Sequence, residues 1–409
     1  MENQLLKNTN YFLCDDTVSI SDDLISKFNN IKNNFFGDVI TSDSELNKHI
    51  DEDNVHLYFY GILKKDMLTL YPCINKLFLV KELSDNLLCD DTIQIINMGQ
   101  IPLNVHNVGV MFNNLFDNER HYFKELDSSH QFQALTESNK PGVSYRKGIY
   151  LSNICEKEDG KYFNLLRCST NLDGPTEKFN DVDKDIINTI NNVSPVVFEQ
   201  HIEINHVLAQ IYNNYVIDGK ERKARIANHS DKTKDMPIHG IMAFCTFYDF
   251  GEIDMDKLNI PEEDNYDLCY KNLSVFTKIK FILKKDVDDP LLVKQFFVTL
   301  YPNSAFMISL TTNRLYTHEI CPSSAPFNTI PTRLGYVMRC SDTVAKFTNN
   351  ETHIFNKENN EFEVLKPQHK EGVKKLKENY RFENFTTDQI EYGHVDFSLN
   401  EGDYLEPLM

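Results

Sequence analysis

Short runs of β-branched and aromatic residues, separated by turn-forming and charged residues, dominate the second half of the chain. Several short strands of this kind, with turns between them, are typical of a β-sandwich or jelly roll. The strands expected are 207–216, 240–250, 273–283, 295–300, 305–310 and 334–339. An acidic stretch at 254–267, interrupted by Pro261, predicts an exposed insertion.

The first half of the chain mixes short apolar runs with helical periodicity. The apolar runs alternate with acidic loops and predict strands at 55–63, 77–80 and 92–98. A helix is expected near 22–29. Apolar residues at helical spacing predict two more helices, over 110–126 and over 183–193, and Pro195 marks the end of the second.

Charge and composition narrow the classes of function. The 409 residues carry a net charge of −19, from 61 acidic and 42 basic side chains, which disfavours tight nonspecific binding of nucleic acid without a local basic patch. Nine scattered cysteines without a C-x-x-C pair favour reduced thiols over a zinc cluster or a disulfide framework. The polar N-terminus and the absence of a long apolar run predict an intracellular protein, cytoplasmic or nuclear, without a membrane segment.

The motif H-x-D occurs three times, at 49–51, 229–231 and 394–396. Non-haem Fe(II) oxygenases bind iron through two histidines and one carboxylate, which leaves three coordination positions open. The first copy lies in an acidic stretch with no strand entering it, and the third has no histidine after it. The second copy precedes an expected strand and is followed, after a later strand, by His318. The sequence therefore selects 229–231 as the metal-binding copy.

Two arginines follow His318. Arg333 lies 15 residues after it, and Arg339 lies six residues further along the same expected strand. Even spacing places both side chains on one face of the strand. Two arginines facing a sandwich interior are costly without an anion, and a guanidinium offers a bidentate fork to a carboxylate. The alternative is structural: a loop histidine and arginines paired with structural acids.

Taken in order, these motifs resemble those of the AlkB-like branch of the 2-oxoglutarate/Fe(II)-dependent dioxygenases. That branch carries H-x-D, then a distal histidine, then R-x₅-R, which here are His229-Ser230-Asp231, His318 and Arg333 to Arg339. A looser N-x-Y-x-D-G element matches at 213–219. The chain departs from the family pattern in the long gap between Asp231 and His318.

The resemblance implies Fe(II), 2-oxoglutarate and O₂ as cofactors and cosubstrates. It implies that His229, Asp231 and His318 bind the iron. Four further residues are implied at 2-oxoglutarate: Arg333 pairs with one of its carboxylates, Arg339 lies nearby, and Asn213 and Tyr215 help to hold it. The implied reaction hydroxylates or oxidatively dealkylates a substrate C–H bond and releases succinate and CO₂.

The fold class expected is α+β. A double-stranded β-helix, the jelly-roll core, would be flanked by helices and preceded by an accessory α/β region. The accessory region is placed at 1–104, the core at 105–345 and a C-terminal extension at 346–409. The extension contains a Lys-rich helix for which a solvated face or a docking site for an anionic partner is expected, with four lysines on one side, Lys366, Lys370, Lys374 and Lys377.

The substrate stays open at this level. AlkB-type enzymes mostly act on alkylated nucleic-acid bases, as demethylases, and some act on proteins. Six basic residues flank the H-x-D element, Lys220, Arg222, Lys223, Arg225, Lys232 and Lys234. They either form a solvated hairpin or steer a phosphate-bearing substrate, with Lys220, Arg222 and Lys223 as the candidate contacts. The motifs are also compatible with a protein or small-metabolite substrate, and with an inactive jelly-roll interaction module.

Overall fold

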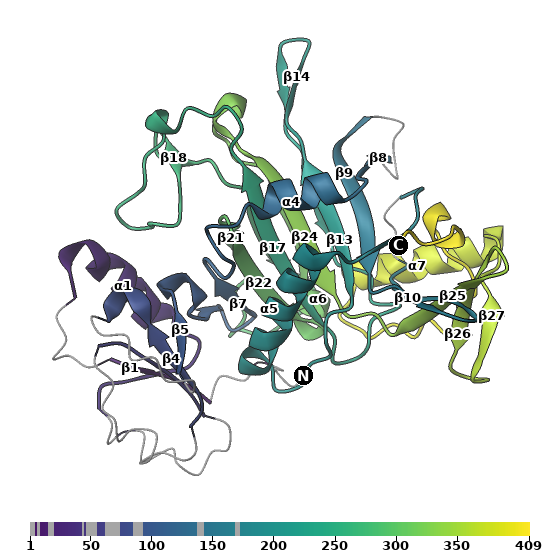
Figure 1. Cartoon of the computed structure of the whole chain (residues 1–409), viewed down its shortest axis with the longest axis horizontal. Coiled ribbons are helices and arrows are strands. Elements are labelled where there is room, and N and C mark those ends of the chain that lie inside the picture. The colour runs from purple at the N-terminus through teal and green to yellow at the C-terminus, as the bar shows by residue number, and fades with distance from the viewer. Residues whose placement is uncertain are drawn as a thin grey trace.

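The centre of the molecule consists of two mainly antiparallel sheets that face each other (Figure 1). The computed structural model describes residues 5, 9–14, 20–42, 45, 55–61, 74–84, 93–136, 143–167 and 172–409. The major sheet has the strand order β12 (Glu177–Lys178), β9 (Val143–Ser152), β13 (His206–Tyr212), β24 (Thr332–Arg339), β17 (Ile241–Asp249), β22 (Ser304–Ser309), β7 (Gly109–Phe112) and β6 (Leu103–Val105), with β8 (Gln133–Thr136) beside β9. The minor sheet has the order β16 (Ile226–His229), β23 (Tyr316–Cys321), β20 (Lys278–Leu283) and β21 (Gln295–Thr299).

The path of the chain between the two sheets identifies the fold. From β13 to β24 the chain alternates between major and minor sheet, with β20 and β21 as a hairpin in the minor sheet. The four central strands of the major sheet and the four strands of the minor sheet pair antiparallel throughout. This alternation is the winding of a double-stranded β-helix, so the predicted jelly-roll core is confirmed.

Side-chain alternation separates the interior of the jelly roll from its outer helical layer. On β24, Leu334, Tyr336 and Met338 belong to the apolar cluster that also contains buried residues of α4 (Tyr122–Ser129) and α5 (Asp181–Val197). Because successive strand residues point to opposite faces, Arg333 and Arg339 point to the other side, into the jelly roll. Figure 1 shows α4 and α5 lying across the outer face of the major sheet.

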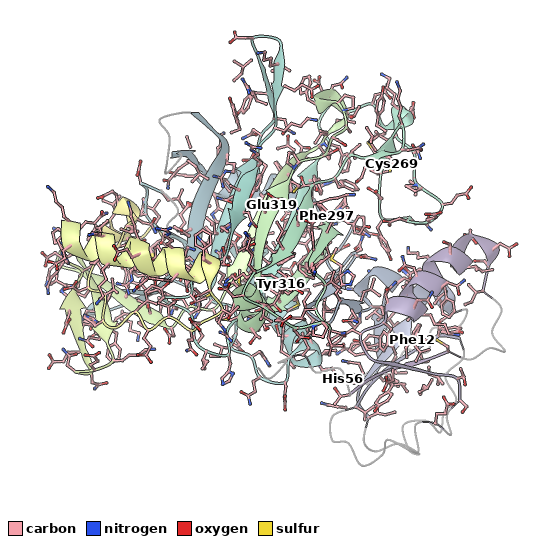
Figure 2. All side chains as sticks on the ribbon, turned by 180° about the vertical axis from the view of Figure 1, so that it is seen from behind. Phe12, His56, Cys269, Phe297, Tyr316 and Glu319 are labelled. Carbon is pink, nitrogen blue, oxygen red and sulfur yellow. The ribbon has the colours of Figure 1, made fainter. Side chains whose placement is uncertain are left out.

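Among the residues that the structure describes, no such helical layer covers the outer face of the minor sheet. Phe297 is 51% exposed, with Lys280 over its ring, and Lys280 also pairs with Glu319 at 3.1 Å. Figure 2 shows Phe297 and Glu319 on this side of the molecule. The two sheets therefore differ, since one is buried on both faces and the other on one.

Three expectations along the core require correction. The helix expected over 110–126 is wrong in its first part, because 109–112 forms strand β7, which pairs with β22; its apolar run is compatible with either structure. The strand expected over 207–216 ends at Tyr212 and is followed by a separate hairpin of β14 (Tyr215–Ile217) and β15 (Lys220–Arg222). The strands β16 and β23 were not expected at all.

The N-terminal region is a separate parallel sheet, which confirms the expected α/β character. Its strand order is β2 (Asp38–Ile40), β1 (Asn10–Leu13), β3 (Val55–Phe59), β4 (Ile74–Val80) and β5 (Ile93–Ile96), with α1 (Asp22–Asn34) beside it. The side chain of Asn10 donates to the carbonyl of Val196 at 2.9 Å, and Phe35 forms an isolated bridge with Leu103. The boundary at 104 remains a prediction.

The C-terminal part of the chain is interleaved with the core. A further sheet combines two strands from before the jelly roll with three after it, in the order β10 (Cys155–Lys157), β11 (Gly160–Leu165), β25 (Thr343–Thr348), β26 (Glu351–Asn356) and β27 (Glu361–Val364). The Lys-rich segment forms helix α7 (Lys370–Phe385). Lys370, Lys374 and Lys377 are exposed on it, whereas Lys366 precedes the helix and pairs with Asp396 at 2.6 Å. No helix among the described residues is long and apolar enough to cross a membrane.

A buried histidine beneath the outer helical layer predicts a pH dependence of stability. His130 lies 2.9 Å from Asp183 and 3.3 Å from Glu177, and Asp183 also accepts from the hydroxyl of Tyr336 at 2.7 Å. Burial opposes the charge on His130, but the hydrogen bonds to the two carboxylates outweigh it and raise its pKa to about 9.

Because this pKa lies above the unfolded value of about 6.5, the stabilisation is complete below pH 6.5 and is lost as the pH rises to 9. We expect the free energy of unfolding, from urea titrations, to fall over this interval by at most about 3 kcal/mol. His130→Gln should remove this part of the pH dependence. An identical slope in the variant would contradict the assignment.

Candidate metal centre

Two histidines face each other across neighbouring strands of the minor sheet. His229 on β16 and His318 on β23 are direct cross-strand partners, and their ring centroids lie 4.5 Å apart. His318 is buried, with the rings of Phe244 and Phe281 at 5.4 and 5.6 Å. Burial, and then the neighbouring His229, lower the pKa of His318 to about 3. It is therefore a neutral imidazole, the form that binds a metal ion.

Asp231 completes the group. Its Oδ1 lies 3.4 Å from Nε2 of His229 and 4.0 Å from Nε2 of His318, and the three potential ligand atoms lie within 4.8 Å of one another. Nδ1 of His229 lies 2.9 Å from the carbonyl of Ala227, an arrangement that leaves Nε2 directed at Asp231. These side chains form a two-histidine, one-carboxylate set. That donor set fits the facial coordination of Fe(II) in non-haem oxygenases.

Of the other two H-x-D copies, the one that the structure describes, at 394–396, is not part of this group. His394 is exposed and lies 3.1 Å from Glu363, as part of the surface near β27. The copy at 49–51 lies outside the described residues. The sequence selects the copy at 229–231 because His318 follows it, and in the structure His229, Asp231 and His318 lie together.

Asp231 is held through its other oxygen and through its backbone. Nε and Nη2 of Arg339 donate to Oδ2 at 2.9 and 2.6 Å. Asn313, on α6 (Leu310–Leu315), accepts from the backbone N–H of Asp231 and donates to its carbonyl, both at 2.9 Å. Burial alone would raise the pKa of Asp231, but Arg339 and the two histidines hold it well below its usual range. Asp231 is therefore ionised, with Oδ1 directed at the histidines.

Arg333 presents a buried guanidinium without an acidic partner among the described residues. Its side chain is 4% exposed and lies over the ring of Tyr212 at 3.8 Å. Its Nε and Nη2 are buried without a hydrogen-bond partner in the described part of the chain, as is Oγ1 of Thr246. Thr246 is the cross-strand partner of Gly335, where a Cβ would lie 2.7 Å from Nη1 of Arg333. A buried guanidinium beside an unsatisfied hydroxyl fits a carboxylate.

The upstream element is placed differently from the expectation. Tyr215 is 43% exposed on the β14–β15 hairpin, which projects from the molecule (Figure 1), with its ring 5.5 Å from that of Tyr145. The backbone N–H of Asn213 donates to the carbonyl of Tyr145 at 2.9 Å. Two inward-facing residues near the end of the preceding strand are Gln210 and Tyr212, whose side chains share a 3.0 Å hydrogen bond. Alternation along 206–212 is the sequence signal that would have found them.

The basic patch expected beside the H-x-D element does not form a continuous surface. Lys232 and Lys234 are buried, and Lys234 pairs with Asp235 at 2.7 Å. Nζ of Lys223 donates to the carbonyls of residues 323 and 325 at 3.1 and 2.6 Å. The remaining three side chains are exposed, at Lys220, Arg222 and Arg225. The sequence does not show that Lys223, Lys232 and Lys234 are bonded within the protein, so it overestimates the basic surface.

Comparisons with known proteins add the following findings. No protein-family model and no curated protein matches this chain. Among the solved structures that match is the non-heme alpha ketoglutarate dependent epimerase SnoN from nogalamycin biosynthesis, at 7% identity and a TM-score of 0.33, covering 58% of this chain and 80% of SnoN. Another is OsALKBH1, at 11% identity and a TM-score of 0.32, covering 57% of this chain and 97% of OsALKBH1. The jelly-roll assignment rests on the strand order, and no residue role is transferred from either protein.

Proposed function

We propose that this chain is an Fe(II)- and 2-oxoglutarate-dependent dioxygenase that hydroxylates or oxidatively dealkylates a substrate C–H bond. The observation that carries the proposal is that a set of metal-binding side chains and a buried cation for a carboxylate lie in the same interior of the jelly roll. His229, Asp231 and His318 offer a facial ligand set, and Arg333 offers a buried cation without an acid among the described residues. Neither feature is needed by a jelly roll that only packs.

Each residue has a distinct task in this proposal. Fe(II) with 2-oxoglutarate and O₂ supplies the oxidising chemistry and releases succinate and CO₂. The two imidazoles and Oδ1 of Asp231 bind the ion, while Arg339 fixes the orientation of Asp231 through Oδ2. Arg333 binds the distal carboxylate of 2-oxoglutarate, beside Thr246.

We further propose that Gln210 and Tyr212 take the place first given to Asn213 and Tyr215. Tyr212 supports the guanidinium of Arg333 from one side, and its hydroxyl is fixed by Gln210. A guanidinium held against an aromatic face loses little further freedom when it binds a carboxylate, so the site is partly preorganised. Phe244 and Phe281 line the same interior and limit the access of water around His318.

Arg333→Met is expected to weaken 2-oxoglutarate binding about 10- to 100-fold, because a charge-assisted bidentate bond is worth roughly 1.5–3 kcal/mol. Calorimetric titration of 2-oxoglutarate into the metal-loaded protein measures this. Arg222→Met is the matched control, since Arg222 is exposed on the hairpin. Equal affinities in the two variants would contradict the role of Arg333.

The activity itself is tested by succinate release. Metal-loaded protein is incubated with 2-oxoglutarate and O₂, alone and with methylated oligonucleotides, peptides or metabolite pools. We expect Arg333-dependent succinate, stimulated by one of these classes. Folded, metal-loaded protein that forms no succinate under any of these conditions would favour the inactive interaction module.

Nucleic-acid bases remain one proposed substrate class, and proteins or small metabolites the other. The exposed cations on the hairpin are Lys220 and Arg222, and such a small number supports only weak contacts with phosphates. Charge reversal at both positions separates the classes. Loss of oligonucleotide-stimulated turnover in this variant would support a nucleic-acid substrate. Turnover that is stimulated by peptides or metabolites and is unchanged by the charge reversal would support the other class.

A further inference from the structure

The C-terminal end of helix α7 lies against the loop that carries two of the metal ligands. Oδ1 of Asn384 accepts a hydrogen bond of 2.8 Å from the backbone N–H of Ser230, the residue between His229 and Asp231. The hydroxyl of Ser230 donates to the carbonyl of Tyr316 on β23 at 3.2 Å. Figure 2 shows α7 running up to the strand that carries the labelled Tyr316. The residue between the ligands is thus fixed to α7 on one side and to the minor sheet on the other.

A buried lysine forms a second connection. Lys232 directly follows Asp231, and its Nζ donates to Oδ1 of Asn384 at 2.8 Å and to the carbonyl of Tyr380 at 3.1 Å. It also donates to the carbonyl of Ser230 at 3.0 Å. The C-terminal end of a helix carries partial negative charge, so a buried ammonium is favourable near it. Oδ1 of Asn384 therefore joins the residue before Asp231 to the residue after it.

A third contact continues along the loop. Glu383 is buried, and its Oε1 accepts from both the backbone N–H and the hydroxyl of Thr233. Beside these residues lies a cavity of about 210 Å³, with Thr233, Asn313 and Glu383 in its wall. The hydrogen bonds to α7 therefore add to those from Asn313 and Arg339 in fixing the position of the loop.

We propose that the end of α7 is part of the metal centre, with Asn384 and Lys232 as positioning residues for His229 and Asp231. The proposal rests on the proposed function, because it concerns the same metal site. It assigns a role to a segment that lies outside the jelly roll in sequence and that sequence reasoning treats as an extension. Partners that orient metal ligands commonly contribute about 10- to 100-fold to metal affinity.

Two substitutions of one residue separate positioning from general destabilisation. Asn384→Ala removes the oxygen that both donors share. Asn384→Asp keeps an oxygen at this place for Ser230 and Lys232, so it should restore the contact. Lys377→Ala is the control on the same helix, since Lys377 is exposed and lies seven positions before Asn384.

The readouts are the affinity and visible spectrum of Co(II), used as a probe for the iron site, and amide hydrogen exchange over 226–236 in metal-free protein. We expect Asn384→Ala to bind Co(II) about 10-fold more weakly, with an altered spectrum and faster exchange at Ser230. Asn384→Asp and Lys377→Ala should behave like the parent protein. Parent-like Co(II) affinity in Asn384→Ala would overturn the proposal, whether or not exchange is faster, and would leave the proposed function intact.

Failure of the proposed function has a different signature. If the parent protein itself binds no Co(II), the metal site is disproved, and the positioning role falls with it. If Asn384→Asp is as weak as Asn384→Ala, the shared oxygen is not what positions the loop, and the proposal is overturned on that ground. A weak Asn384→Ala with a parent-like Asn384→Asp supports it.

Discussion

His318→Ala is expected to weaken Co(II) or Fe(II) binding at least about 100-fold, a larger effect than that of any residue acting through a ligand. His318 is the buried one of the two histidines, and its neutral imidazole already lies beside Asp231 and His229. Removing it leaves two ligands, one of them partly exposed, which do not hold an ion in a facial arrangement. Calorimetric titration of the metal-free protein gives the affinity.

The matched control uses another copy of the same motif. His394 belongs to an H-x-D sequence, but it lies at the surface beside Glu363. His394→Ala should retain the affinity of the parent protein. If both variants lose affinity equally, or neither does, the ion binds elsewhere and the assignment of the metal centre is wrong.

Asp235→Ala is expected to lower the free energy of unfolding by about 3–5 kcal/mol, the cost of leaving buried charges without a partner. Asp235 is buried and bonds to Arg167 through Nη2 at 2.9 Å, through Nε at 3.3 Å and through the backbone N–H at 2.6 Å. Lys234 lies 2.7 Å from it, and Thr343 also donates to it. Without Asp235, Arg167 and Lys234 lose the carboxylate to which they are bonded. Urea denaturation measures the change.

An exposed carboxylate provides the comparison. Asp254 pairs with Lys257 at 2.9 Å in the acidic insertion, where solvent screens the pair. Asp254→Ala should leave the denaturation midpoint unchanged within error. A similar loss in both variants would show that the buried network has no special weight.

The sequence points to a candidate ligand set because two histidines and a carboxylate have specific metal chemistry and their order along the chain is informative, and the structure brings these three side chains together. His229, Asp231, His318 and Arg333 lie in one interior, where the pattern places them. The strands that carry the two histidines were not found, because β16 and β23 are short and mix polar with apolar residues. Their pairing is a long-range property that local periodicity does not contain.

Other parts of the site cannot be derived from local sequence patterns. From the sequence alone, either Tyr212 or Tyr215 could be the tyrosine that faces the interior. The structure shows that strand β13 ends at Tyr212, whose side chain is buried, and that Tyr215 is exposed on the hairpin that follows. That Arg339 lies near 2-oxoglutarate stays a prediction, and its bond to Asp231 is known only from the structure. The contact of Asn384 with Ser230 spans 154 positions, and no local pattern predicts it.

The position of β16 has one more consequence. It is one of the two edge strands of the minor sheet, it is four residues long, and its pairing with β23 is irregular between Ile226 and His229. Register on such an edge is weakly specified, and a slip of one residue would turn His229 away from its partner. An ion bound by both histidines would link β16 to β23 at this weakly specified edge of the minor sheet. The concentration of free metal ion would then determine how firmly β16 is held in this register, as well as whether the site is active.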